Sequence, residues 1–172
     1  MTKIGALFFT LAIGFLTGCA TTTPQPQTVA SVDLKRYLGT WHEIARIPNW
    51  FQRSCDRGVT AQYSVNPDGS IRVENSCLRA DGKRITAIGR ATVVPDSGNA
   101  RLRVSFFEPF KGDYWILALD PNYQWVLVGN PARNYLWILA RTPTLPEPVY
   151  AKIVARAVAA GYDPSRLVRS QP

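Results

Sequence analysis

The sequence predicts an all-β protein: an eight-stranded antiparallel up-and-down β-barrel with one C-terminal α-helix packed against its outside. Eight runs rich in β-branched and aromatic residues follow one another between residues 41 and 141. Short turn sequences join each run to the next, so neighbouring strands should pair antiparallel. The one clear helical pattern comes after the last run. Eight strands in this order can close on themselves, which removes the exposed edges of the sheet.

The expected strands alternate regularly with turn signals. In chain order they cover residues 41–47, 59–65, 70–78, 84–94, 101–107, 114–120, 124–130 and 135–141. The links include NPDG at 66–69 and ADGK at 80–83, which are typical of hairpin turns. In the fifth run every second residue is apolar, at Leu102, Val104 and Phe106. One face of each strand is therefore expected to line the interior of the barrel.

The expected helix covers residues 144–161. Apolar residues recur at helical spacing from Val149 to Val158. Thr144 and Glu147 form a candidate capping box, and Gly161 is a natural C-terminal stop. Such a one-sided helix needs a flat apolar surface, which the outside of a barrel offers. The residues after it, 162–170, are expected to add a short strand.

The N-terminal residues have the layout of an export signal. Lys3 precedes an apolar run at 4–16, which is shorter than the ~20 residues that a membrane-spanning helix needs. LTGC at 16–19 resembles the bacterial lipobox, in which the cysteine is acylated and becomes the first residue of the mature protein. A membrane-anchor helix with an incidental cysteine is the alternative. The lipobox implies a signal peptide at 1–18 and lipidation of Cys19.

The segment after Cys19 has no charged or aromatic residue up to residue 31 and is expected to be a flexible tether. The predicted organisation is thus a signal peptide at 1–18, a lipidated N-terminus and tether at 19–32, and a barrel domain at 33–172. Ala20 stands where an aspartate would favour the inner membrane of a Gram-negative bacterium. The lipobox therefore implies attachment to the outer membrane.

Charge and cysteine content narrow the class of protein. The formal charge is +8, or +7 once a signal peptide containing Lys3 is removed. The basic residues are dispersed and no nucleic-acid-binding motif accompanies them, so we expect no nucleic-acid partner. With Cys19 acylated, Cys55 and Cys77 remain, and an even pair in an exported protein favours a disulfide. Two buried free thiols are the alternative.

Tracing the barrel as an up-and-down meander brings distant residues to one end. Gly39 and Trp41 begin the first strand, the link Asp120–Tyr123 follows the sixth, and Arg141 ends the eighth. All of them should lie at the end that we call closed. A guanidinium stacked on an indole is favourable, so Trp41 and Arg141 are expected to plug this end.

These residues resemble the three short motifs of the lipocalins. YLGTWHEIARIP, VSFFEPFKGDYWILALD and YLWILARTP are more similar still to the bacterial outer-membrane lipoprotein branch of that family. The second motif departs from the usual Thr-Asp-Tyr form, with Leu119 and Pro121-Asn122 around the aspartate, and His42 stands where this branch often has Tyr. The resemblance implies a calyx that binds fatty acids or lysophospholipids for lipid storage or transport and envelope maintenance. It also implies a periplasmic, lipid-anchored location.

The opposite, open end is the expected ligand entrance. Cys55 and Cys77 should meet at this rim and hold the first link. The predicted wall residues are Tyr63, Phe106, Tyr114 and Trp137, for which core packing is the alternative. The candidate partners of a lipid phosphate at the rim are Arg53, Arg57 and Lys111, for which a solvated surface role is the alternative.

No catalytic site is predicted. His42 is the single histidine, so a conventional zinc site would be hard to assemble, and neither G-x-S-x-G nor H-E-x-x-H occurs. We expect no metal, no cofactor and no enzymatic activity. The competing hypothesis is a non-catalytic envelope scaffold whose barrel is filled by its own side chains, with Trp50 and Phe51 as an interface. The sequence leaves both a monomer and a homodimer open.

Overall fold

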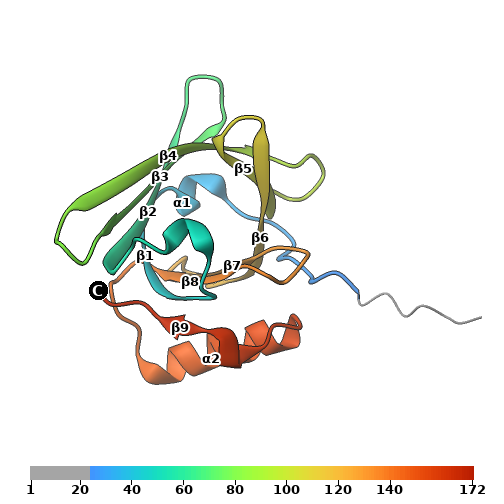
Figure 1. The fold of residues 1–172 in the computed structure, drawn as a ribbon. Helices are drawn as coiled ribbons and strands as arrows, with labels where there is room; N and C mark the ends of the chain where they lie inside the picture. Colours follow the sequence, from blue (N-terminus) through green and yellow to red (C-terminus); the bar gives the residue numbers. More distant parts are fainter. Residues whose placement is uncertain (1–23) are drawn as a thin grey trace, which may run out of the picture.

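The strands of this chain form a closed antiparallel barrel (Figure 1), seen in a computed structural model that describes residues 24–172. Each strand pairs with the next one in the chain, and the first pairs with both the eighth and the second. The predicted fold class is confirmed. The strands are β1 (Gly39–Arg46), β2 (Arg57–Val65), β3 (Ile71–Leu78), β4 (Arg84–Val93), β5 (Arg101–Phe107), β6 (Phe110–Leu119), β7 (Trp125–Gly129) and β8 (Leu136–Ala140).

The main departure from the predicted strand bounds lies in β6. This strand begins at Phe110, earlier than expected, and the turn before it consists of Glu108 and Pro109. Phe107 pairs with Phe110 across that turn. The polar residues 111–113 were expected to form a loop. They fit a strand because this hairpin protrudes: Lys111 is exposed, while Asp113 forms an ion pair with Arg103 at 2.9 Å.

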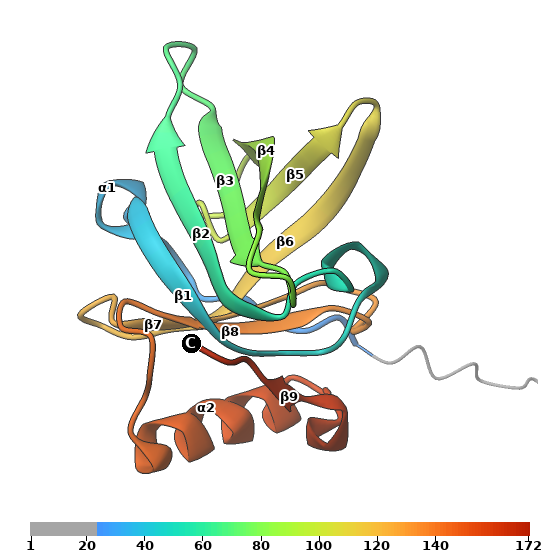
Figure 2. The ribbon, with the colours of Figure 1, turned by 60° about the vertical axis from the view of Figure 1, so that its left-hand side comes forward.

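The helix α2 (Glu147–Ala159) covers the outside of the barrel, as Figures 1 and 2 show. Its buried residues Ile153 and Ala157 belong to a core cluster with outward-facing side chains of β1, β7 and β8. The predicted capping box is wrong: Pro146 occupies the N-cap position, and no side chain caps the helix. Gly161 follows the helix with φ of 85°, and β9 (Val168–Arg169) pairs with β1 as the expected extra strand.

The closed end of the barrel is capped by the short helix α1 (Leu34–Tyr37), shown in blue in Figure 2. Gly39 follows it with φ of 91°, a left-handed conformation that lets the chain bend into β1. Trp41 is then fully buried, and its Nε1 donates a hydrogen bond to the Tyr37 carbonyl at 2.8 Å. The indole thus fills the end of the barrel that α1 crosses.

The β6–β7 link and the end of β8 meet at the same place. Arg141 donates to the carbonyl oxygens of Thr40 at 2.9 Å and Arg36 at 2.7 Å, and its Nε donates to the Tyr123 carbonyl at 3.3 Å. The Asp120 carboxylate accepts hydrogen bonds from two backbone amides of its own link, those of residues 122 and 124. The structure therefore brings together the five residues predicted to converge.

Residues 24–32 lie along the barrel, whereas the sequence predicted a flexible tether over 19–32. The Val32 amide donates to the Gly98 carbonyl at the closed end, and the Val29 amide donates to the Ile116 carbonyl in β6. Arg133, in the β7–β8 link at the open end, donates to the Pro24 carbonyl. This segment therefore runs from the open end to the closed end. The predicted signal peptide and Cys19 lie outside the described residues.

No helix within residues 24–172 has both the length and the apolar character that crossing a membrane would require.

Candidate ligand-binding site

An aromatic cluster lies at the open end of the barrel, between the β1–β2 link and β8. The short helix η1 (Trp50–Gln52) supplies Phe51, whose ring centroid lies 5.5 Å from that of Tyr135 and 6.2 Å from that of Trp137. Tyr135 and Trp137 stack at 5.8 Å. Trp137 is half-buried and also packs against the interior core cluster. The rings thus form an apolar surface that continues from the rim into the barrel.

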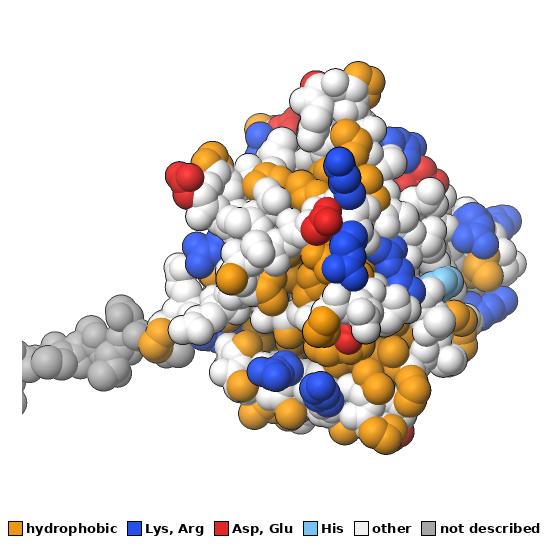
Figure 3. Space-filling view, turned by 180° about the vertical axis from the view of Figure 1, so that it is seen from behind, with side chains coloured by type: hydrophobic (Ala, Val, Ile, Leu, Met, Phe, Trp, Pro, Cys, Tyr) orange, Lys and Arg blue, Asp and Glu red, His pale blue; other side chains and the backbone are white. Residues whose placement is uncertain are grey.

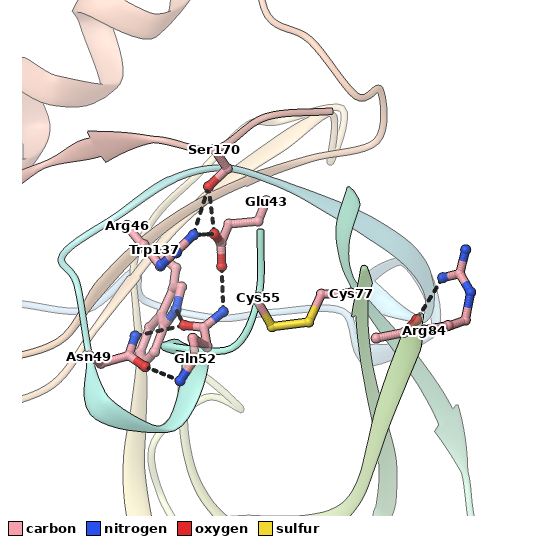
Figure 4. Close-up of a disulfide and its surroundings, with 10 residues drawn as sticks. Glu43, Arg46, Asn49, Gln52, Cys55, Cys77, Arg84, Trp137 and Ser170 are labelled. Carbon is pink, nitrogen blue, oxygen red and sulfur yellow. Dashed lines mark hydrogen bonds and ion pairs between the residues drawn. A yellow bond between two sulfur atoms is a disulfide. The ribbon is translucent and has the colours of Figure 1, made fainter. Parts of the chain in front are cut away.

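Hydrogen bonds hold η1 over β1 and β8 (Figure 4). The Gln52 amide donates to a carboxylate oxygen of Glu43 at 2.7 Å, and its carbonyl accepts from Trp137 Nε1 at 2.9 Å. The buried Glu43 also accepts from Arg46 at 2.6 Å and from Ser170. Because one buried carboxylate joins β1, η1 and the C-terminal tail, the orientation of the rim is fixed by residues far apart in the sequence.

The other end of the β1–β2 link is covalently attached to β3. Cys55 and Cys77 form a disulfide with their Cα atoms 5.6 Å apart, as Figure 4 shows. The predicted pairing is therefore present in the structure. Together with the Gln52 contacts, the disulfide holds both halves of the β1–β2 link, which we call the entrance link, against the barrel.

Three tyrosines occupy the interior nearer the closed end. The Tyr114 hydroxyl lies 2.7 Å from that of Tyr37 and 2.9 Å from that of Tyr63. These rings and apolar side chains line a cavity of about 10 Å³, enough space for about one water molecule. Its other lining residues are Leu34, Leu38, Ile71, Ala91, Leu102 and Val104. This part of the barrel is filled by its own side chains.

Burial controls the ionisation of these phenols. Desolvation raises the pKa of Tyr37, Tyr63 and Tyr114 well above the ordinary value, and each phenolate is further disfavoured by a neighbouring tyrosine. All three side chains are therefore neutral at physiological pH. They offer hydroxyl groups, without charge, at the base of an apolar interior.

Phe106 does not join the interior cluster. The pairing of β5 with β6 shifts between Val104 and Phe107, and an extra residue in one strand breaks its in–out alternation. Phe106 is 44% exposed and lines an open groove of about 340 Å³ with Arg72 and Arg90. Arg72 lies between two buried residues of β3 and so faces outward, whereas the Phe106 ring lies against Gly89, which pairs with the buried Val73. The role of Phe106 as a ligand-contacting wall residue stays a prediction.

The three cationic candidates lie around the open end on separate elements. Arg53 follows η1 and is exposed, Arg57 begins β2, and Lys111 is exposed near the start of β6. Arg57 forms an ion pair with Asp56 at 2.9 Å. On the face seen in Figure 3, Lys and Arg side chains are scattered among apolar and uncharged ones. Each of the three residues could contact a ligand at the rim of the barrel, but they do not form one cluster.

Sequence reasoning did not single out four residues of this site: Tyr37, Glu43, Gln52 and Tyr135. Tyr135 stands two positions before Trp137 and therefore on the same face of the strand, a signal that could have identified it. Gln52 had no such signal, because its role depends on Glu43 and Trp137 lying beside it. His42, the single histidine, is half-buried in β1.

Most of this chain matches the model of a single protein family. Residues 32–172 match the model of the family described as "Lipocalin-like domain". The chain is 43% identical over 154 residues to "Outer membrane lipoprotein Blc" of Citrobacter freundii, covering 87% of this chain and 86% of that protein. The Vibrio cholerae protein of the same name is 37% identical over 168 residues, covering 96% and 98%. "Temperature-induced lipocalin-1" of Arabidopsis thaliana is 42% identical over 149 residues, covering 82% and 80%.

Solved structures share the fold at much lower identity. Insecticyanin from the tobacco hornworm Manduca sexta superposes with a TM-score of 0.69 at 18% identity, covering 88% of this chain and 86% of that one. Lobster apocrustacyanin A1 gives a TM-score of 0.65 at 19% identity, covering 86% and 89%. At this identity the likeness concerns the barrel and its outer helix alone.

Proposed function

This chain belongs to the lipocalin-like family, and from that premise we propose that it is a membrane-anchored protein that captures fatty acids or lysophospholipids at the open end of its barrel. The observation that carries the proposal is the aromatic surface of Phe51, Tyr135 and Trp137, which continues into the apolar interior. Lipid storage or transport and envelope maintenance would follow from such capture.

Side chains fill the barrel near its closed end, and this limits where an acyl chain would lie. The cavity beside Tyr114 holds about 10 Å³, so a chain entering it has to move side chains. The main contacts of the acyl chain are therefore expected near the open end, against Trp137 and Phe51. Each buried methylene contributes about 0.8 kcal/mol, so several must be covered to offset the loss of translational freedom.

A polar head group would remain at the rim. Arg53 and Lys111 are exposed and Arg57 is partly exposed there, so each can approach a phosphate without being taken out of water. A fatty acid carboxylate needs fewer such contacts than a lysophospholipid. Comparing the two ligands therefore measures what the rim contributes to affinity. The proposal contains no catalytic step and no metal or cofactor.

Anchoring through a lipidated Cys19 completes the proposal. The bacterial relatives carry the name outer membrane lipoprotein, which supports an outer-membrane location for this chain. The periplasmic face is the side we propose, because a carrier of lipids between membranes would work there. Acyl chains on one residue provide the multiple lipid contacts that stable attachment requires.

Native mass spectrometry on residues 20–172, purified without detergent, tests capture directly. Saturable one-to-one binding of a lysophospholipid or a fatty acid is expected, with a change in tryptophan fluorescence. Trp137→Leu should weaken binding roughly tenfold, about 1.4 kcal/mol. Trp115→Leu is the control, because the Trp115 ring stacks with Arg101 and is not among the ring contacts of Phe51, Tyr135 and Trp137. Failure of the folded protein to bind either lipid would refute capture.

The small cavity favours one alternative, a non-catalytic envelope scaffold. In that hypothesis the filled barrel is only a support, and the exposed Trp50 and Phe51 bind a protein or form a homodimer. The same experiment separates the two. A scaffold would show no lipid adduct, while a homodimer would appear at twice the monomer mass.

A further inference from the structure

The open end of the barrel carries all of the exposed aromatic side chains found in residues 24–172. Trp50 and Phe51 protrude from the β1–β2 link and are 72% and 48% exposed. Phe107 and Phe110 flank the tip of the β5–β6 hairpin, at 74% and 71%, and Phe106 lies just before them at 44%. Both segments join strands at the end opposite α1. Aromatic rings at an exposed rim are typical of a surface that enters a lipid interface.

The described chain begins at this same end. Arg133, in the β7–β8 link, donates a hydrogen bond to the Pro24 carbonyl, and Figure 2 shows the chain leaving the described residues at the end opposite α1. Cys19 precedes Pro24 by five residue steps, which span at most about 18 Å when fully extended. Residues 24–32 use eight residue steps to run from the open end to the closed end. A membrane at the closed end would require the five steps between Cys19 and Pro24 to span that same distance.

Charge follows the same asymmetry. The links at the open end, counted with the two residues that follow each, contain seven Lys or Arg and three acidic residues. The seven are Arg53, Arg57, Arg79, Lys83, Arg84, Lys111 and Arg133. The closed end consists of residues 33–38, its own links counted in the same way, and Arg141. It contains five Lys or Arg and four acidic residues. A surface with excess positive charge is complementary to anionic lipid head groups.

From these three observations we propose that the open end of the barrel faces the bilayer, with Trp50, Phe51, Phe107 and Phe110 in contact with the lipid surface. The inference rests on the proposed lipidation of Cys19, and it adds an orientation to that anchor. The mouth then opens onto the membrane, so a lipid passes between bilayer and barrel without crossing bulk water. The exposed rings act as the contact surface and the short tether keeps them there.

Hydrogen exchange on the full lipidated protein tests this orientation. The protein is reconstituted on vesicles of phosphatidylethanolamine and phosphatidylglycerol and compared with the Cys19→Ala chain in solution. Amides of residues 50–53 and 106–111 should exchange several-fold more slowly on vesicles. Amides of 66–69 and 95–99, at the closed end, should be unchanged. Slower exchange at the closed end, or equal exchange at both ends, would overturn the orientation.

Two controls separate the causes. The Cys19→Ala chain without vesicles, measured over a range of protein concentrations, should show no protection at the rim; protection that rises with concentration would assign the rim to self-association and overturn the proposal. If the lipidated protein fails to sediment with vesicles, the anchor itself fails and the orientation falls with it. That result leaves lipid capture by the soluble barrel intact and testable.

Variants then test the two contributors. A twelve-residue Gly-Ser segment inserted directly before Pro24 lengthens the tether. The protein should still sediment with vesicles, but the amides of residues 50–53 should be less protected from hydrogen exchange. Phe107→Ser with Phe110→Ser should reduce protection at 106–111. Val65→Ser, at a 57% exposed apolar residue of the closed end, is the control. Full rim protection in both test variants would contradict the proposed roles of tether and rings.

Discussion

The guanidinium carbon of Arg141 lies 3.8 Å from the centre of the Trp41 indole ring. The two residues are a hundred positions apart in the chain and come from the end of β8 and the start of β1. Their contact joins the strands that close the barrel, and it lies directly behind α1. The same guanidinium also satisfies carbonyl groups of the chain that crosses this end.

Replacing Arg141 should therefore weaken the closed end. Arg141→Ala removes the stack on Trp41 and leaves the Thr40 and Arg36 carbonyls without their donor. We expect a loss of about 2–4 kcal/mol in the free energy of unfolding, measured by urea denaturation. Arg141→Lys keeps the charge but not the planar fork, so it should recover only part of this loss. Equal stability of the alanine variant and the parent would contradict the plug.

The buried tyrosines predict a loss of stability in alkali. Burial raises the pKa of Tyr63 and Tyr114 in the folded state above 10.0, the ordinary value that the unfolded chain keeps. Below about pH 10 both states hold these protons, so this contribution to stability is fully present. Above it the unfolded chain loses protons that the folded chain retains, and stability falls by up to about 1.4 kcal/mol per pH unit for each tyrosine.

Urea denaturation between pH 8 and pH 11 measures this dependence, and Tyr63→Phe is the informative variant. It removes one titrating group while keeping the ring, so the fall in stability above pH 10 should be shallower than in the parent. A slope unchanged by the substitution would mean that Tyr63 does not control the alkaline transition.

The disulfide should stabilise the fold and hold the entrance link. Cys55 and Cys77 are separated by 22 positions, and closing a loop of this size contributes about 3 kcal/mol in the chain-entropy model. The double variant Cys55→Ser, Cys77→Ser should lose about that much in urea denaturation. A denaturation midpoint identical with and without reductant would argue against the bond in the purified protein.

The buried carboxylate of Glu43 predicts a separate effect on the mouth. Glu43→Gln replaces an acceptor oxygen with an NH₂ donor that faces the donors of Gln52 or Arg46. We therefore expect the free energy of unfolding to fall by about 1–3 kcal/mol. Hydrogen exchange at 50–53 should become faster, since η1 loses its contact with β1. Glu74→Gln, in a partly exposed ion pair with Arg72, is the control and should change stability by less than about 0.5 kcal/mol.

Strand order could be predicted because it depends on local information. Turn sequences such as residues 66–69 fix neighbouring strands as antiparallel pairs, and alternate links must then lie at alternate ends. The convergence of Trp41 with Arg141, and of Cys55 with Cys77, follows from that rule alone. Side-chain burial within a strand was harder to predict, because the pairing shifts after Val104 and Phe106 is 44% exposed and outside the interior core cluster.

The amino-acid sequence by itself determined the barrel, its closed and open ends and the outer helix, since periodicity and turn chemistry act over a few residues. Only the tertiary structure decided how the ends are built. Gln52 meets Glu43 and Trp137, and residues 24–32 lie against β6, because strands distant in the sequence provide the groups they bind. The position of Pro24 beside the mouth depends on such long-range contacts, which no local pattern encodes.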